Sequence, residues 1–137
     1  MSWGAYVQNL EAGKGRCRYA GIYGKSPIGV WAESPDKSNF PITCEDVSTA
    51  TRAITSQDMN IMSTGLKIGG KLNFTCLRME PDLLICQGKG ENKDYSLVIA
   101  LSTQAVIIGF NPDADTKTAY VRDAIESIRD YLKNLGY

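Results

Sequence analysis

Apolar residues near the two ends of the sequence recur at the spacing of helix faces. The intervals are three or four residues, which places the apolar side chains on one side of a helix. The patterns predict a first helix over residues 2–11 and a last helix over 118–135. The apolar positions are Trp3, Tyr6, Val7 and Leu10 in the first helix, and Val121, Ile125, Ile128, Leu132 and Leu135 in the last. Ser2 is a favourable N-cap for the first helix, and Gly13 and Gly15 are expected to end it.

The segment between these helices alternates apolar runs with short polar turns, a pattern typical of strands. Strands are predicted over 18–23, 28–33, 71–79, 83–87, 95–101 and 105–110, with a further strand from Gly65 that ends in a Gly69-Gly70 turn. Most connections are too short for a parallel crossover, so neighbouring strands are expected to be antiparallel. A second helix is expected from Thr43, where Thr43 and Asp46 have the spacing of a capping box. Residues 58–64 are ambiguous, and we interpret them as a short strand.

This order of elements predicts an α+β fold in one domain over residues 1–137. We expect a single central antiparallel β-sheet, with the N- and C-terminal helices packed together on one face and a short helix on the other. Hydrophobic residues make up 43% of the 137 residues, which is enough for one core of ordinary size. The two terminal helices would then bring the aromatic residues at both ends of the sequence together.

The charge of the chain gives no sign of a nucleic-acid partner. Fifteen basic and fifteen acidic residues cancel, so no overall field attracts a polyanion. No apolar run approaches the length of a membrane span, and residues 1–10 lack the pattern of a secretory signal. We therefore expect a cytoplasmic monomer that is not an integral membrane protein.

The residue types that many enzymes use are scarce. The sequence contains no histidine and its four cysteines have no C-x-x-C spacing, so we expect no metal site, catalytic group or cofactor. Reduced, mostly buried thiols are expected at Cys17, Cys44, Cys76 and Cys86. Because Cys76 and Cys86 are symmetric about Pro81, a hairpin there would place them face to face. A thiol-dependent enzyme that uses Cys17 or Cys86 is the rival hypothesis, although no motif surrounds either residue.

Aromatic residues near the ends of the sequence exceed what a helix–helix core needs. They are Trp3, Tyr6, Tyr131 and Tyr137, and Trp31 on the second predicted strand is expected to join them. Such side chains are costly to leave in water unless they pack or bind a ligand. Aromatic grooves bind proline-rich segments, because a polyproline II helix is already ordered and its rings stack on aromatic faces. The residues therefore predict a binding module for proline-rich partners.

Several segments, taken in order, resemble the profilin family. They are Ser2-Trp3-x-x-Tyr6-Val7-x-x-Leu10, Ser26-Pro27 with Val30-Trp31-Ala32, Gly65 to Gly70, Glu80-Pro81, Gly88-Lys89-Gly90, Gln104 to Gly109, and Asp130-Tyr131-Leu132 with Gly136-Tyr137. The ordered set spans nearly the whole chain and is more specific than any single piece. The resemblance implies a small cytosolic protein of the cytoskeleton that binds monomeric actin, proline-rich segments of actin-assembly factors and phosphoinositides, and that regulates actin polymerisation.

The resemblance also implies which residues contact each partner. The polyproline-binding residues would be Trp3, Tyr6, Trp31, Tyr131, Leu132 and Tyr137. The actin-binding residues would be Asn73, Thr75, Arg78, Lys89 and Arg122, and we place Arg78 and Lys89 on the sheet face away from the aromatic ends. Weak binding of phosphatidylinositol bisphosphate would use the scattered residues Lys89, Lys93, Arg129 and Lys133. Because the family usually has asparagine where Arg122 stands, the alternative is a divergent module that binds proline-rich peptides with weak or no actin binding.

Overall fold

A single antiparallel sheet is the centre of the computed structural model, which describes residues 2–12 and 16–137. The strands pair in the order β2-β1-β7-β6-β5-β4-β3, and each neighbouring pair is antiparallel. Their bounds are β1 Tyr19–Lys25, β2 Ile28–Glu33, β3 Leu66–Ile68, β4 Leu72–Glu80, β5 Leu83–Gly88, β6 Ser96–Leu101 and β7 Ala105–Asn111. Because β7 pairs with β1, the first hairpin and the later strands belong to one sheet.

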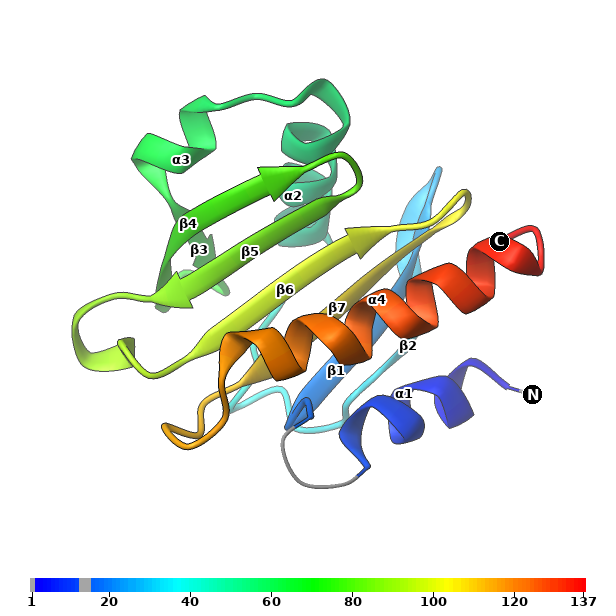
Figure 1. Cartoon of the computed structure of the whole chain (residues 1–137), viewed down its shortest axis with the longest axis horizontal. Coiled ribbons are helices and arrows are strands. Elements are labelled where there is room, and N and C mark those ends of the chain that lie inside the picture. The colour runs from blue at the N-terminus through cyan, green and yellow to red at the C-terminus, as the bar shows by residue number, and fades with distance from the viewer. Residues whose placement is uncertain (1, 13–15) are drawn as a thin grey trace.

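The helices are divided between the two faces of this sheet (Figure 1). One face carries α1 (Trp3–Glu11) and α4 (Thr118–Asn134) side by side, and we call it the helix-pair face. The other face carries α2 (Cys44–Ser56) and α3 (Asn60–Thr64), and a 3-10 turn, η1 (Gly90–Asn92), follows β5. This arrangement confirms the predicted α+β fold, with the first and last helices packed together on one face.

Each face of the sheet has its own hydrophobic core. On the helix-pair face, Val121, Ile125 and Leu132 of α4 are fully buried, as their helical spacing predicted. On the opposite face, the rings of Phe40 and Phe110 stack with centroids 4.9 Å apart. Burying one such side chain contributes roughly 1.5–3 kcal/mol, so both helix layers are held firmly to the sheet.

Local sequence signals account for several element ends. The Thr43 hydroxyl accepts a hydrogen bond from the Asp46 amide, and the Asp46 carboxylate accepts one from the Thr43 amide, which completes the predicted capping box of α2. The Gly-Gly turn joins β3 to β4, with φ of 60° at Gly69 and 69° at Gly70, a conformation that glycine adopts at little cost. The β4–β5 hairpin places Cys76 opposite Cys86, with their Sγ atoms 3.5 Å apart. The symmetry about the turn therefore predicted this pairing correctly.

The prediction of a strand over residues 58–64 is wrong, because residues 60–64 form the helix α3. The Asp58 carboxylate accepts a hydrogen bond from the Asn60 amide at the start of this helix. At its end, the Gly65 amide donates to the Ile61 carbonyl. Local hydrogen bonds at both ends therefore accompany a helical turn in this short segment, whose apolar pattern is weak.

The ends of the first and last helices were predicted at residues 11 and 135. The assignment of Leu135 to the apolar stripe of the last helix is wrong, since Leu135 follows the end of α4 and is 52% exposed. The expectation that Gly13 and Gly15 end the first helix falls outside the described residues. Among the described residues, α1 ends at Glu11.

Candidate functional site

Five aromatic side chains from separate segments meet beside the helix pair. They are Trp3 and Tyr6 of α1, Trp31 of β2, Tyr131 of α4 and Tyr137 beyond α4, and we call them the aromatic cluster. The ring centroids of Trp3 and Trp31 are 4.6 Å apart, and Tyr137 meets the Trp3 ring edge-on at 5.2 Å. The Tyr6 ring lies 5.7 Å from Trp3 and 6.0 Å from Tyr131. Sequence reasoning predicted all five members of this cluster.

The opposite directions of α1 and α4 set the order of residues along the cluster. Trp3 meets Tyr137, and Tyr6, one turn further along α1, meets Tyr131. Figure 1 shows the two helices side by side, with the start of α1 on the same side of the molecule as the end of α4. Because successive turns of a helix are about 5.4 Å apart, the two pairs of rings follow each other along the helices. The rings therefore form a line that an extended peptide can follow.

Backbone hydrogen bonds hold Tyr137 beside the two tryptophans. Its amide donates to the Leu132 carbonyl at 2.8 Å, and its carbonyl accepts from the Ser102 hydroxyl at 2.6 Å. The Gln104 amide donates to the same carbonyl, and the Gln104 side chain donates to the Gly136 carbonyl at 2.9 Å. Sequence reasoning missed Ser102 and Gln104, because both have the character of ordinary turn residues between strands.

Trp31 occupies a position where the neighbouring strand has no side chain. A Cβ atom built on Gly24 of β1 would lie 2.8 Å from Trp31 Nε1 and 3.0 Å from the Pro27 carbonyl oxygen. A larger residue at position 24 would therefore push the indole away from the sheet. Glycine here lets Trp31 approach the backbone and pack against the Trp3 ring.

The cluster is partly open to solvent. Tyr131 and Tyr137 are 46% and 41% exposed, and Trp3 and Trp31 are half-buried. Burial, together with the nearby Tyr131, raises the pKa of Tyr6, so its hydroxyl remains a hydrogen-bond donor at neutral pH. Leu132, which the resemblance placed among the ligand-binding residues, has no exposed surface. It lies in the core of the helix-pair face and supports the cluster from beneath.

A hollow lies at each end of the cluster. The hollow at the Tyr131 end has a volume of about 350 Å³ and is lined by Tyr6, Asn9, Arg16, Ser127, Ile128 and Tyr131. The hollow at the Trp31 end has a volume of about 420 Å³, lies along the β1–β2 hairpin and extends to Gln104. We call the cluster and its two hollows the aromatic groove. Its rings can stack on proline rings, while hydroxyl and indole N–H groups can donate to the carbonyls that a polyproline II helix leaves free.

The residues predicted to contact actin lie mainly on β4. Asn73 and Arg78 are exposed, and Thr75 is half-buried between them. Lys89 follows β5 beside this strand, where its amide donates to the Asn73 carbonyl at 3.0 Å. Arg122 comes from the first half of α4 and reaches the end of β4. The structure therefore brings the β4 residues and Arg122 together, whereas the Lys89 ammonium lies beside Gly65, just before β3.

The expectation that Arg78 lies on the sheet face away from the aromatic ends is wrong. Regular alternation after Cys76 would place it there, but the register shifts between Cys76 and Arg78, so that Arg78 pairs with Ile85. The Ile85 side chain belongs to the core of the helix-pair face, and paired residues of antiparallel strands share a face. Arg78 therefore lies on the same face as the aromatic cluster. Figure 1 shows α4 lying between β4, the strand of Arg78, and α1, the helix of Trp3 and Tyr6.

Two arginines converge on one carboxylate at the end of β4. Arg78 Nε lies 2.7 Å and Arg122 Nη2 3.0 Å from Glu80 Oε2. Arg122 Nε also donates to Glu126 at 3.3 Å, and this hydrogen bond raises the pKa of Arg122. Sequence reasoning missed Glu80, which gives this surface mixed charge. We call the surface formed by Asn73, Thr75, Arg78, Glu80 and Arg122 the β4 flank.

The basic residues assigned to phosphoinositides do not form one site. Lys89 and Lys93 flank η1, after the end of β5. Arg129 and Lys133 reach Asp82 at the other end of β5, where Arg129 donates to its carbonyl at 3.3 Å and the Lys133 ammonium lies 3.8 Å from its carboxylate. Since β5 spans roughly 20 Å at the usual rise of a strand, the two pairs face different parts of the surface. None of the helices in the described ranges has the length and apolarity to span a membrane.

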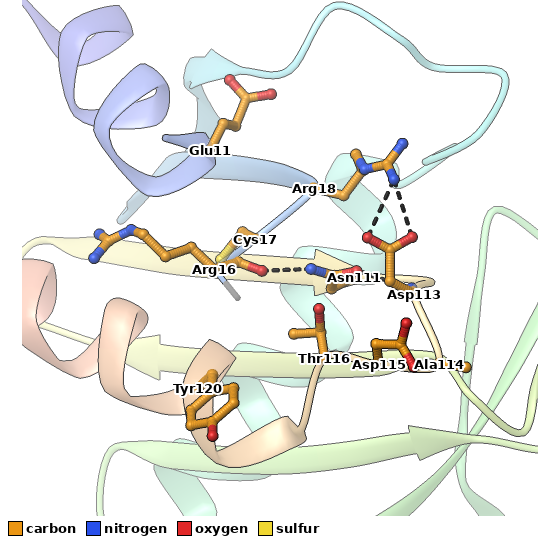
Figure 2. Close-up of a pocket in the computed structure, with 10 residues that line it drawn as sticks. All are labelled: Glu11, Arg16, Cys17, Arg18, Asn111, Asp113, Ala114, Asp115, Thr116 and Tyr120. Carbon is orange, nitrogen blue, oxygen red and sulfur yellow. Dashed lines mark hydrogen bonds and ion pairs between the residues drawn. The ribbon is translucent and has the colours of Figure 1, made fainter. Parts of the chain in front are cut away.

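Another hollow, of about 570 Å³, lies where the end of α1, the start of β1 and the β7–α4 connection meet (Figure 2). Arg18 donates to both carboxylate oxygens of Asp113 there, at 2.9 and 3.1 Å. Burial raises the pKa of the neighbouring Cys17 thiol to about 12. The pKa of Cys86 is also raised, because its thiol donates to Cys76 and is removed from water. Both thiols therefore stay protonated at neutral pH, which weighs against the thiol-dependent enzyme.

Metal binding finds no support in residues 2–12 and 16–137. Within these ranges, no three or more cysteine, aspartate or glutamate side chains are grouped so that they could hold an ion. The cysteines of the described part of the chain are free thiols, of which Cys44 is exposed.

Comparisons with known proteins cover the whole chain. The family model for Profilin matches residues 1–137. Profilin-1 of Entamoeba histolytica is 34% identical over 137 residues, which is 100% of both chains, and Profilin-1 of Caenorhabditis elegans is 29% identical over 135 residues, which is 98% of both. Acanthamoeba castellanii profilin IA superposes with a TM-score of 0.80 at 22% identity, over 99% of this chain and 100% of its own. Mouse profilin IIa, in complex with a double repeat from the FH1 domain of mDia1, has a TM-score of 0.81 at 19% identity over 100% of both chains.

Proposed function

Since this chain belongs to the profilin family, we propose that it is a non-enzymatic cytoplasmic module that joins an actin monomer to a proline-rich segment of an actin-assembly factor. Through this joining it would regulate actin polymerisation. The aromatic groove is the proline-binding site, and the β4 flank with Lys89 is the actin-binding site. The two sites lie on either side of α4, so both partners can be bound together.

The observation that carries the proposal is the aromatic cluster. Rings from α1, β2 and the end of α4 form one line of contacts, with the Trp3 and Trp31 centroids 4.6 Å apart. These rings are in place before any ligand arrives, so binding orders few side chains. The mouse relative is in complex with a double repeat from an FH1 domain, which supports a proline-rich partner for this groove.

The proposed actin site rests on family membership and on the composition of the β4 flank. Asn73 and Arg78 of the flank are exposed, and Leu77, next to Arg78 on β4, is 52% exposed. We expect a one-to-one complex that buries an interface of standard size, about 1,600 Å² in total. A small apolar contact surrounded by polar and charged groups is a usual composition for such an interface.

A second candidate is a divergent profilin that binds proline-rich segments but has weak or no affinity for actin. The ion pairs of the β4 flank favour it, because Arg78 and Arg122 are already engaged by Glu80. Reorganising these pairs would lower the net gain from contact with actin. Weak binding of phosphatidylinositol bisphosphate is a further expectation, limited by the separation of its basic residues.

Isothermal titration calorimetry tests the proposal. We expect the protein to bind an oligoproline peptide and monomeric actin, each with one-to-one stoichiometry. Peptide should bind the actin complex about as tightly as it binds the free protein, because α4 separates the sites. Binding of peptide without actin would establish the divergent module instead. Failure to bind either ligand would overturn both candidates.

A further inference from the structure

Arg16 lies at the Tyr131 end of the aromatic groove, in the hollow that Tyr6 and Tyr131 also line. Its Nη2 donates to Asn9 Oδ1 at 3.2 Å. Its Nε is buried and has no hydrogen-bond partner among the described residues. Within residues 2–12 and 16–137, no carboxylate oxygen lies within 4.0 Å of the Arg16 guanidinium. This positive charge therefore has unused donor capacity at the end of the groove.

The backbone around Arg16 is well anchored. The Asn111 side chain donates to the Arg16 carbonyl, and the Cys17 amide donates to the Leu10 carbonyl at 3.2 Å. Figure 2 shows the Arg16 side chain extending away from the ion pair of Arg18 and Asp113. Arg16 thus borders both the hollow at the Tyr131 end of the groove and the hollow of Figure 2, whereas the charge of Arg18 is neutralised by Asp113 within the latter.

A groove ligand can reach this guanidinium. Asn9, which accepts from Arg16, is six residues after Trp3 in α1, a rise of about 9 Å. A polyproline II ligand advances about 3.1 Å per residue, so about three residues cover the same distance. A ligand stacked on Trp3 therefore places a residue near Arg16 about three positions further along.

The side chain that best suits this position is a carboxylate. An arginine guanidinium binds a carboxylate through charge-assisted, often paired, hydrogen bonds from its terminal nitrogens. We infer that Arg16 selects proline-rich partners that carry an aspartate or glutamate on the flank of the proline run that reaches the Tyr131 end. This inference rests on the proposed proline-binding function and adds the identity of the flanking residue to it.

Calorimetry with capped oligoproline peptides tests this selection. One pair of peptides carries aspartate or asparagine before the proline run, and a second pair carries them after it. The direction of the bound ligand decides which of the two pairs responds. In that pair, the aspartate peptide should bind wild type about fivefold more tightly than the asparagine peptide, because a partly exposed ion pair has an effect of about this size. This preference should fall as salt concentration rises.

Three variants connect the preference to Arg16. Arg16→Gln should abolish it, measured as the ratio of the aspartate and asparagine peptide affinities of the same variant, and Arg16→Lys should keep part of it, because lysine lacks the planar fork. Arg18→Gln is the matched control and should keep all of it, since Arg18 is paired with Asp113. Equal affinity for aspartate and asparagine peptides, or a preference that survives in Arg16→Gln, would overturn the inference alone. If wild type does not bind plain oligoproline, the proposed function fails, and the inference fails with it.

Discussion

The aromatic groove and the β4 flank share one face of the sheet, on either side of α4. They differ in whether their surface groups are already paired within the protein. In the groove, Tyr131 and Tyr137 remain 46% and 41% exposed after the rings have packed against each other. On the flank, Arg78 and Arg122 are already paired with Glu80. A groove ligand covers apolar surface without breaking an internal contact, whereas a flank ligand competes with ion pairs inside the protein.

This difference predicts two kinds of binding behaviour for the two proposed sites. Affinity in the groove should depend on a few aromatic anchors and change little with salt. Affinity at the flank should depend on the balance between internal and intermolecular ion pairs, and therefore on ionic strength. Substitutions in one region should leave ligand binding in the other unchanged, because the buried stripe of α4 lies between them.

The largest effect is expected where the groove rests on the core. Leu132→Ala should lower the free energy of unfolding by about 2–5 kcal/mol, because it opens a cavity beneath the aromatic cluster. Tyr137→Ala, which removes a side chain that is 41% exposed, should change it by about 0.5 kcal/mol or less. Urea unfolding measures both. Equal destabilisation by the two substitutions would show that Leu132 is not the support of the groove.

A smaller effect is expected from charge reversal on the flank. Arg78→Glu should weaken binding of monomeric actin by roughly tenfold at low ionic strength, mainly through slower association, because a basic contact becomes acidic beside Glu80. Stopped-flow and calorimetric titrations measure the rate and the affinity. Arg52→Glu is the matched control, since Arg52 is exposed on α2 across the sheet. Unchanged actin affinity in Arg78→Glu, with wild type binding normally, would remove the β4 flank from the actin site.

The smallest effect is expected at membranes. Vesicles that contain phosphatidylinositol bisphosphate should co-sediment the protein only at low salt, because each basic residue near an anionic surface contributes about 1 kcal/mol. Lys89 and Lys93 lie beyond one end of β5, while Arg129 and Lys133 lie near Asp82 at the other. Binding that persists at physiological salt would mean that these residues act together after all.

Helical spacing predicted the groove well, because its residues lie on elements with strong local signals. Trp3 and Tyr6 follow the period of α1, and Tyr131 lies within the long amphipathic helix α4. Antiparallel packing of the two helices then brings the rings into line. Helical spacing also placed Leu132 in the apolar stripe of the last helix, where it is buried, whereas the resemblance assigned it to the ligand-binding residues.

The β4 flank was less predictable, because its geometry depends on one irregularity in the pairing of β4 with β5. A register shift between Cys76 and Arg78 moves Arg78 to the other face of the sheet, and no glycine or proline marks this shift in the sequence. The hydrogen-bond partners of Tyr137 were equally hard to predict, since Ser102 and Gln104 are distant from it in sequence and act through their positions in a turn. Contacts between remote segments and shifts in strand register carry little local signal.

Whether the aromatic cluster binds proline-rich segments can be measured by a calorimetric titration of folded Trp3→Ala with oligoproline. Trp3 contacts Tyr6, Trp31 and Tyr137, so its removal should cost about 2 kcal/mol or more of binding free energy, a loss of about thirtyfold or more. Tyr120→Ala is the aromatic control, since Tyr120 is 50% exposed beside the other hollow of Figure 2, and it should bind like wild type. Both variants should retain the actin affinity of wild type. Oligoproline binding by folded Trp3→Ala at wild-type affinity would contradict the account.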